Sequence, residues 1–460
     1  MKILVLNGSP KGKESITLQY VNYIQKKIHT HSYEVENISQ RIKRIEKDES
    51  VFQEIIQKID DADAVIWAVP LYVCLVPSQY KRFIELIWER KANSVFKNKY
   101  TAVITTSIHF YDHTANNYMR AVCEDLEMKF IDYLSPHMHS LQQEEGRQNT
   151  VKFAENFFDT IKNQLPVSRL YYPVKKSNFS YQAKKVEQKI SCKGEKILII
   201  TDDTNKKSNS SKMLAQFKSN FVEDIEVVNI RELDIKGGCL GCIQCGYDYT
   251  CQYNGKDEFT EFYREKIIQA DILVLVGTIT DRFLSARWKM FFDRAFFNTH
   301  TSTMISKQML YLISGSLSQT PNMSEIFVAL AQIQKANLLD FVTDESENSE
   351  AIDKLIAVSS QKVISFSKQK VIREADFLGV GGMKIFRDDI YGILRFPFIA
   401  DYKAYKKLGI MKFSHRKIKY KITNTIMVIL SKIPKVRERI YKDKIIPGMV
   451  EPLKKIVETK

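Results

Sequence analysis

The sequence predicts an α/β protein in which two doubly wound parallel sheets follow one another and precede a basic C-terminal extension. Short, almost continuously apolar segments alternate with segments of helical periodicity, as in parallel sheets that are covered on both faces. The whole alternation also occurs twice. The matching segments are 2–7 with 196–201, 61–70 with 269–278, and 99–106 with 307–314.

These patterns place the elements of each copy. In the first copy we expect strands near 2–7, 33–38, 63–69, 100–106 and 128–132. Helices should lie near 15–29, 50–60, 76–90, 114–127 and 150–163. In the second copy we expect strands near 196–201, 225–230, 271–277, 307–314 and 338–342, with helices between them. Five strands with intervening helices are typical of a doubly wound sheet.

The two copies also set the expected domain boundaries. The offset between matching residues grows from 194 at the first strand to 208 at the third, so the second copy has gained about 14 residues. We expect a first domain at 1–165, a linker at 166–194, a second domain at 195–370 and the basic extension at 371–460.

The composition of the 460-residue chain is that of a globular protein, with 44% hydrophobic and 27% charged residues. It excludes a disordered, collagenous or disulfide-stapled protein. The sequence has no run of the ~20 apolar residues that cross a bilayer, and it begins without a signal-peptide pattern. Because there are only seven cysteines and no export signal, we expect a cytoplasmic protein.

The net charge of +15 is concentrated at the C-terminal end, where residues 401–460 hold 17 Lys and Arg against 5 Asp and Glu. A basic tail on a near-neutral body favours a local surface for an acidic protein partner or an anionic membrane. Residues 422–440 add apolar side chains at close to helical spacing. The alternative is a helix that packs on its own domains. No nucleic-acid motif accompanies the charge, so we expect no nucleic-acid partner.

The first loop of the first copy has the chemistry of a phosphate site. It runs from Asn7 through Gly8 and Ser9 to a helix that begins near Ser15. The free N–H groups of a helix N-terminus and the hydroxyls of the loop suit a phosphate. The loop matches neither the Walker pattern nor GxGxxG, which disfavours nucleotide hydrolysis and a standard dinucleotide site. The alternative is an ordinary strand-to-helix turn that Ser15 caps.

The loops of the first copy carry a family resemblance. Gly8-Ser9-Pro10 with Ser15 and Thr17, and Pro70-Leu71-Tyr72 after the third strand, resemble the NADPH-dependent FMN reductase family, whose fold is flavodoxin-like. The resemblance spans most of 1–165 and, more weakly, 195–370. It implies that the FMN phosphate is bound by Ser9, Lys11, Ser15 and Thr17. It implies that the flavin ring is flanked by Pro70, Leu71, Tyr72 and Val73, with Thr106 and Ser107 nearby.

The second copy departs from this pattern at the matching positions. Asp202 and Asp203 replace the Gly-Ser pair, which places like charge near any phosphate. Thr278-Ile279-Thr280 replaces the Pro-x-Tyr segment. We therefore expect the first copy to hold the flavin and the second to be a structural partner, with an occupied second pocket as the alternative.

A compact cysteine motif lies in the second copy. Cys239, Cys242, Cys245 and Cys251 have the spacing C-x2-C-x2-C-x5-C, with glycines beside them. Four thiolates in one loop suit an iron–sulfur cluster of the 4Fe–4S type. The segment resembles the cysteine motif of iron–sulfur flavoproteins. Unmetallated cysteines and a zinc site are the alternatives.

Together these observations lead us to expect an FMN-dependent NAD(P)H oxidoreductase. Electrons would pass from the nicotinamide through FMN to a small acceptor such as a quinone, a free flavin or a nitro compound, with an iron–sulfur cluster as a further relay. One alternative is an electron-transfer flavoprotein module that serves a protein partner, and another is a scaffold whose flavin sites have decayed. The resemblance also implies that the two copies pair as the subunits of dimeric relatives do; a homo-oligomer of the chain is a further alternative.

Overall fold

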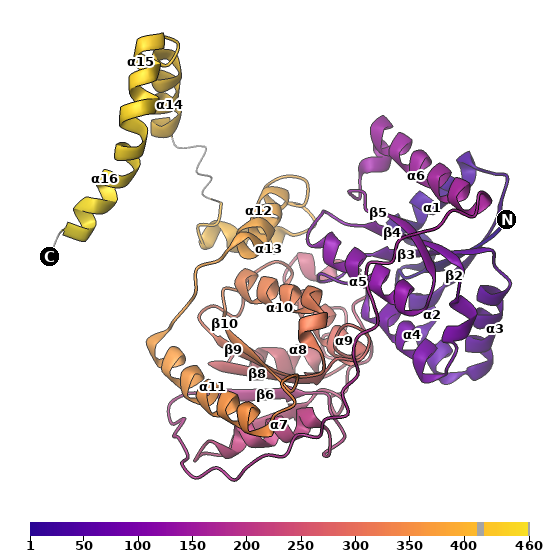
Figure 1. Ribbon diagram of the computed structural model, residues 1–460, viewed down its shortest axis with the longest axis horizontal. Coiled ribbons are helices and arrows are strands. Elements are labelled where there is room, and N and C mark those ends of the chain that lie inside the picture. The colour runs from indigo at the N-terminus through magenta and orange to yellow at the C-terminus, as the bar shows by residue number, and fades with distance from the viewer. Residues whose placement is uncertain (412–417, 459–460) are drawn as a thin grey trace. The chain divides into compact units, whose positions relative to one another are not determined.

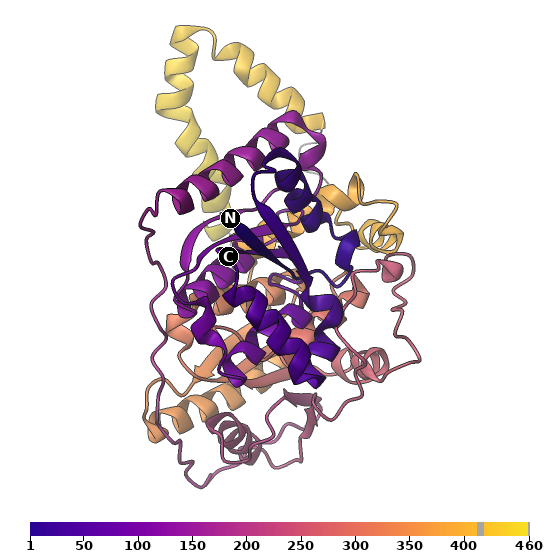
Figure 2. The ribbon, with the colours of Figure 1, turned by 90° about the vertical axis from the view of Figure 1, so that its right-hand side faces the viewer.

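A computed structural model describes residues 1–411 and 418–458. The chain divides into two compact units, Met1–Tyr402 and Lys403–Lys460. Both copies of the repeat lie in the first unit, where they contact one another (Figures 1 and 2).

The first copy forms a five-stranded parallel sheet. Its strands are β1 Lys2–Asn7, β2 Ser32–Asn37, β3 Ala64–Pro70, β4 Tyr100–Thr106 and β5 Lys129–Leu134. They pair in the order β2-β1-β3-β4-β5. Because the winding reverses between β1 and β3, the loops after these strands diverge and leave a crevice at their carboxyl ends.

The second copy repeats this topology. Its strands are β6 Ile197–Thr201, β7 Glu226–Asn229, β8 Ile272–Thr278, β9 Gln308–Ser314 and β10 Asn337–Thr343. The order is β10-β9-β8-β6-β7, with all pairs parallel, so β6 and β8 take the places of β1 and β3. The prediction of two tandem doubly wound sheets is confirmed.

Helices cover both faces of each sheet (Figure 1). In the first copy they are α1 Ile16–Lys27, α2 Ile38–Lys47, α3 Glu49–Asp60, α4 Ser78–Glu89, α5 Asp112–Asp125 and α6 Glu144–Lys162. In the second copy they are α7 Asn209–Ser219, α8 Phe259–Phe262, α9 Ala286–Ala295, α10 Pro321–Ile333 and α11 Ser349–Gln369. One core lies between α1, α6 and the first sheet, and another between α7, α11 and the second.

Helix α2 was not expected from the sequence. Its core positions are Ile38, Ile42 and Ile45, and the residues between them are polar or basic. Only three apolar residues therefore mark its buried face, and a short pattern of this kind is easily lost between a strand and a longer helix.

The segment that joins the copies is anchored to the second one. Between α6 and β6 the chain has no helix, yet Tyr181 is completely buried in the core under α7 and α11. Its hydroxyl donates a hydrogen bond to Asp353. The polar and basic composition of this segment concealed its core residues, Tyr181 and Cys192.

The copies pack through α4 and α9, where buried ion pairs cross the interface. Lys81 is fully buried and binds Asp281 of the second copy, with Glu85 at 3.2 Å on its own helix. The hydroxyl of Tyr118 donates to Asp281 at 2.9 Å. Burial alone would lower the pKa of Lys81, but these two carboxylates raise it, so its charge is retained.

A second buried cluster corresponds to the one around Lys81 through the 208-residue offset between the two copies. Lys289 and Asp293 take the places of Lys81 and Glu85, and they bind each other in the same interface. The Asp293 carboxylate accepts the backbone N–H of Ser78 at 2.8 Å, at the start of α4. The internal duplication has thus produced a pseudo-symmetric pairing of the two copies.

The C-terminal part of the chain is helical. Helix α12 Phe377–Tyr391 belongs to the first unit and α13 Ile399–Lys407 spans the boundary, while α14 Ile418–Leu430, α15 Pro434–Arg439 and α16 Ile445–Glu458 lie in the second. Within residues 1–411 and 418–458, none of the helices combines the length and the apolar character that a membrane crossing needs.

Removing one carboxylate from the interface should destabilise the fold. We expect Asp281→Ala to lower the free energy of unfolding by about 3 kcal/mol, because it leaves the buried Lys81 with Glu85 alone. Glu350→Ala breaks only exposed ion pairs, with Lys184 and Lys354, and should lower the free energy of unfolding far less. Denaturant unfolding of the two variants measures the difference; equal losses would contradict this account of the interface.

Candidate active site

The loops that follow β1, β3 and β4 meet at one cavity of about 540 Å³. Each loop leaves the carboxyl end of its strand, and the strand order brings these ends together. Nine of the ten predicted cofactor-site residues line the cavity: Ser9, Lys11, Ser15, Pro70, Leu71, Tyr72, Val73, Thr106 and Ser107. The tenth, Thr17, is buried, and its hydroxyl oxygen lies 2.6 Å from that of Thr106.

The turn after β1 is held from within by Asn7. Its side-chain amide donates to the carbonyl of Gly12 at 3.0 Å, and its side-chain oxygen accepts the N–H of Ser9 at 3.1 Å. Gly8 is required for close packing, because a Cβ at this position would lie 2.6 Å from a methyl carbon of Val69. The turn is therefore held in shape by its own hydrogen bonds and packing.

Helix α1 begins at the cavity. Ser15 caps it by accepting the N–H of Leu18 at 3.3 Å, and Ser15 and Ile16 both line the cavity wall. The unpaired N–H groups and the positive end of the helix dipole therefore point toward the cavity, together with the cation of Lys11. This end of the cavity suits an anionic group.

The segment after β3 forms a rigid shelf. Tyr72 and Leu75 exchange two backbone hydrogen bonds, of 2.8 and 3.0 Å. Between them, Val73 and Cys74 have positive φ angles of 39° and 62°, a conformation that costs energy in residues with a Cβ. Lys289 of the second copy fixes the shelf from below by donating to the carbonyl of Tyr72 at 2.8 Å.

The hydroxyl of Tyr72 is enclosed by the protein and faces the loop that contains Gly241. It is buried and has no hydrogen-bond partner in the part of the chain that the structure describes. Burial raises the pKa of this phenol, so its proton is retained. A buried hydroxyl without a partner is costly.

A loop of the second copy presses against Tyr72. Gly241 has a positive φ of 65°, and a Cβ built there would lie 2.0 Å from the Tyr72 hydroxyl oxygen. Nearby, the side chain of Gln79 donates to the carbonyl of Cys239 at 3.0 Å. The cysteine-bearing loop is therefore part of the support of the shelf.

The opposite wall of the cavity comes from outside the first copy. The second copy contributes Ile243, Phe296 and His300, and the segment after α11 contributes Phe386 and Phe398. Sequence reasoning missed these residues because they lie far from the recognised loops along the chain. The 208-residue offset between the copies matches Phe296 with Trp88, and this match was the sequence feature that could have drawn attention to Phe296.

His300 is fixed in this wall by Asp401. The Nδ1 atom of His300 lies 2.8 Å from the Asp401 carboxylate, which is fully buried and also accepts the hydroxyls of Thr299 and Thr301. The imidazole packs between aromatic rings of the C-terminal segment, with its centroid 4.2 Å from that of Phe386. An imidazole held by a carboxylate has a defined orientation toward the cavity it lines.

No metal site is found at the cysteine motif in the residues that the structure describes. In the described ranges, no group of three or more His, Cys, Asp or Glu side chains is placed to hold a metal ion. Cys242 is exposed, whereas Cys245 is buried and its thiol points at the carbonyl of Phe296 at 3.7 Å. Burial raises the pKa of Cys239 and of Cys245 to about 12. The iron–sulfur cluster that the spacing suggested is therefore not supported, and it stays a prediction.

The loop after β6 differs from the loop after β1 because one of its own carboxylates accepts hydrogen bonds from its hydroxyl groups. Asp203 stands where the first copy has Ser9, and its carboxylate accepts the hydroxyls of Ser208 and Ser210, which match Ser15 and Thr17. Burial raises the pKa of Asp203, but these hydrogen bonds outweigh burial and hold the pKa below its usual value. The hydroxyls that would bind a phosphate are thus already bound to a carboxylate.

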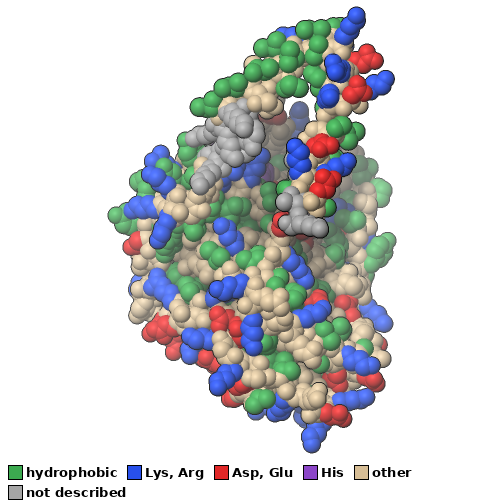
Figure 3. Space-filling view, turned by 90° about the vertical axis from the view of Figure 1, so that its left-hand side faces the viewer, with side chains coloured by type: hydrophobic (Ala, Val, Ile, Leu, Met, Phe, Trp, Pro, Cys, Tyr) green, Lys and Arg blue, Asp and Glu red, His purple; other side chains and the backbone are tan. Residues whose placement is uncertain are grey.

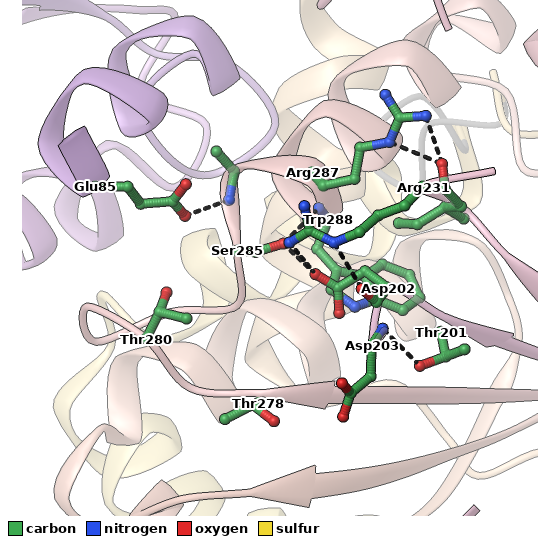
Figure 4. Close-up of polar contacts among 12 residues, drawn as sticks. Glu85, Thr201, Asp202, Asp203, Arg231, Thr278, Thr280, Ser285, Arg287 and Trp288 are labelled. Carbon is green, nitrogen blue, oxygen red and sulfur yellow. Dashed lines mark hydrogen bonds and ion pairs between the residues drawn. The ribbon is translucent and has the colours of Figure 1, made fainter. Parts of the chain in front are cut away.

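A second cavity, of about 1340 Å³, lies beside this loop. Its lining includes Thr278 and Thr280, which take the places of Pro70 and Tyr72, and also Trp88 of the first copy. Figure 4 shows Thr278 at the end of β8, Thr280 in the loop after it, and Asp202, whose carboxylate accepts the hydroxyl of Ser285. This cavity occupies the same position in the second copy as the first cavity does in the first copy. It has no aromatic residue in the place of Tyr72, and its loop hydroxyls are not free to bind a phosphate.

Comparison with known protein families finds the same two copies that the sequence repeat defines. The family model described as NADPH-dependent FMN reductase matches residues 1–140 and 195–339. These ranges fall on the two copies of the repeat. A search of curated protein sequences found no match.

Solved structures resemble single copies of the repeat. FerB of Paracoccus denitrificans, a flavoenzyme NAD(P)H:(acceptor) oxidoreductase, is 20% identical over 35% of this chain and 97% of its own, with a TM-score of 0.30. The FMN-dependent NADH-azoreductase of Bacillus anthracis is 14% identical over 36% and 99%, with a TM-score of 0.28. The NAD(P)H:quinone oxidoreductase of Methanothermobacter marburgensis is 15% identical over 36% and 96%, with a TM-score of 0.27.

A side chain at Gly241 should disturb the Tyr72 shelf. We expect Gly241→Ala to lower the free energy of unfolding by about 1–3 kcal/mol more than Gly255→Ala does, because the added methyl overlaps Tyr72. Gly255 is a matched control: its φ of 70° imposes similar backbone strain, but nothing lies within 4 Å of its Cβ position. Denaturant unfolding compares the two, and equal effects would show that Gly241 does not contact Tyr72.

Proposed function

Because the chain belongs to the NADPH-dependent FMN reductase family, we propose that it binds one FMN in the 540 Å³ cavity and passes electrons from NAD(P)H to a small acceptor. The observation that carries this proposal is the convergence on that cavity of nine residues predicted from three separate loops. FMN supplies the hydride chemistry when bound, and the protein supplies binding and orientation.

The phosphate of FMN fits the turn after β1. The N–H groups at the start of α1, the hydroxyls of Ser9 and Ser15 and the cation of Lys11 all border this end of the cavity. Phosphates bind readily at such helix N-termini. The carboxylate of this loop, Glu14, is exposed and does not line the cavity, whereas Asp203 of the second copy accepts the loop hydroxyls.

The flavin ring fits between the shelf and the opposite wall. Pro70, Leu71 and Tyr72 offer apolar surface and backbone groups. Across the cavity, Phe296 and the fixed imidazole of His300 provide a surface for the molecule that exchanges electrons with the ring. The single active site is therefore built by both copies and by the segment 377–402 together.

The acceptor that fits this wall is a flat aromatic molecule. Phe296, Phe386 and Phe398 give it an apolar, aromatic surface, which suits a quinone, a free flavin or a nitroaromatic compound. The iron–sulfur relay is not part of this proposal, because no group that could hold a metal ion is found among the described residues. The competing function is an electron-transfer module that a protein partner reduces; rapid-mixing reduction by NADPH separates the two, because such a module would not be reduced directly.

An aspartate at position 9, where the second copy has Asp203, should strongly weaken FMN binding. We expect wild-type protein to bind one FMN per chain and Ser9→Asp to weaken binding at least about 100-fold, because a like charge at ~4 Å from a phosphate costs roughly 4 kcal/mol. Ser9→Ala removes one hydrogen bond and should cost about tenfold or less. Quenching of flavin fluorescence measures all three.

Riboflavin, which lacks the phosphate, is the control ligand. Its affinity should be the same within about threefold in wild type and Ser9→Asp, since the change acts on the phosphate end. A wild-type stoichiometry of two FMN, or unchanged FMN affinity in Ser9→Asp, would refute the assignment of the phosphate site.

The pseudo-symmetric pair Phe296 and Trp88 tests the assignment of the opposite wall. Phe296→Ala should lower kcat/KM for quinone reduction at least about tenfold, because it removes an aromatic surface from the catalytic cavity. Trp88→Ala removes the matching ring from the second cavity and should leave kcat/KM within about twofold. A loss in Trp88→Ala as large as that in Phe296→Ala would place activity in both cavities.

A further inference from the structure

The helices of the second unit leave their apolar side chains uncovered. On α16 these side chains recur at helical spacing on one face: Ile445, Ile446, Met449, Val450, Leu453, Ile456 and Val457. Leu453 is 62% exposed and Val457 is 84% exposed. Soluble surfaces rarely carry so many large apolar groups side by side, so this face is a candidate interaction surface.

Helix α14 has the same property. Ile418, Ile422, Ile426, Ile429 and Leu430 follow the spacing i, i+4, i+8, i+11 and i+12, which places them on one face. All five are among the exposed large hydrophobic residues, with Ile422 at 55%. The helices of this unit thus do not cover one another's apolar faces.

Cations accompany these apolar faces. From the end of α14 to α16 the described chain carries Lys432, Lys435, Arg437, Arg439, Lys442, Lys444, Lys454 and Lys455. Residues 401–460 hold 17 Lys and Arg against 5 Asp and Glu. Figure 3 shows hydrophobic side chains along this helical segment with Lys and Arg side chains beside them.

We propose that α14–α16 bind the surface of an anionic lipid bilayer. The apolar faces would enter the boundary between headgroups and acyl chains, while the Lys and Arg side chains contact the anionic headgroups. The positive charge of this unit favours an anionic bilayer over a second copy of the unit or the first unit as the surface that covers the apolar faces. A second copy of this unit carries the same positive charge and would be repelled, and residues 1–400 are themselves slightly basic, with +3 of the total +15. This inference does not depend on the assignment of the flavin site.

Vesicle flotation of the full-length chain tests the proposal. The protein should float with vesicles of phosphatidylcholine and phosphatidylglycerol, and only weakly with phosphatidylcholine alone. Added salt should release it, because part of the attraction is electrostatic. The double variant Ile422→Asp/Leu453→Asp should lower the affinity for the anionic vesicles at least about tenfold, since it places charge in both apolar faces.

A matched variant controls for a general effect of added charge. Val222→Asp changes an apolar residue of the first unit that is 65% exposed, and it should leave vesicle binding unaltered. An unchanged circular-dichroism spectrum and unfolding midpoint of the double variant show that the first unit is intact. The proposal is overturned if the wild type floats with neither vesicle, if the double variant floats as well as the wild type, or if light scattering shows a dimer that the double variant dissolves.

Discussion

The packing of α4 against α9 is the interaction on which the rest of the structure depends. Lys289 binds Asp293 within this interface and also donates to the carbonyl of Tyr72 at 2.8 Å, so the contact between the copies also shapes the shelf of the active site. The same contact brings Phe296 and His300 to the wall opposite the shelf. A single copy would have the phosphate turn and the shelf but only half of a cavity.

Duplication followed by divergence explains why the two cavities differ. The first copy has Ser9 in its loop, whereas the second has Asp203, whose carboxylate takes the hydrogen bonds of Ser208 and Ser210. The Asp203 carboxylate thus supplies, from within the protein, an acceptor for these two hydroxyls, and it stabilises the loop without a ligand. The second copy is then free to serve as the wall and the support of the first site.

The sequence predicted much of the fold and one side of the site. Buried parallel strands are short apolar runs, and their repetition at fixed offsets revealed both sheets. The loops after β1, β3 and β4 carried local motifs, so their residues could be named. His300 and Phe386 could not, because nothing local marks a residue that reaches a cavity from another domain. The cysteine spacing is a local motif as well, but no group that could hold a metal ion is found among the described residues, so the iron–sulfur cluster stays a prediction.

The most direct test of the account is a crystal structure of the chain grown with FMN. The account predicts one FMN per chain, with its phosphate at the start of α1 and its ring between Tyr72 and the wall that contains Phe296 and His300. An FMN bound beside Asp203 in the second cavity, or a phosphate found away from the turn after β1, would contradict it.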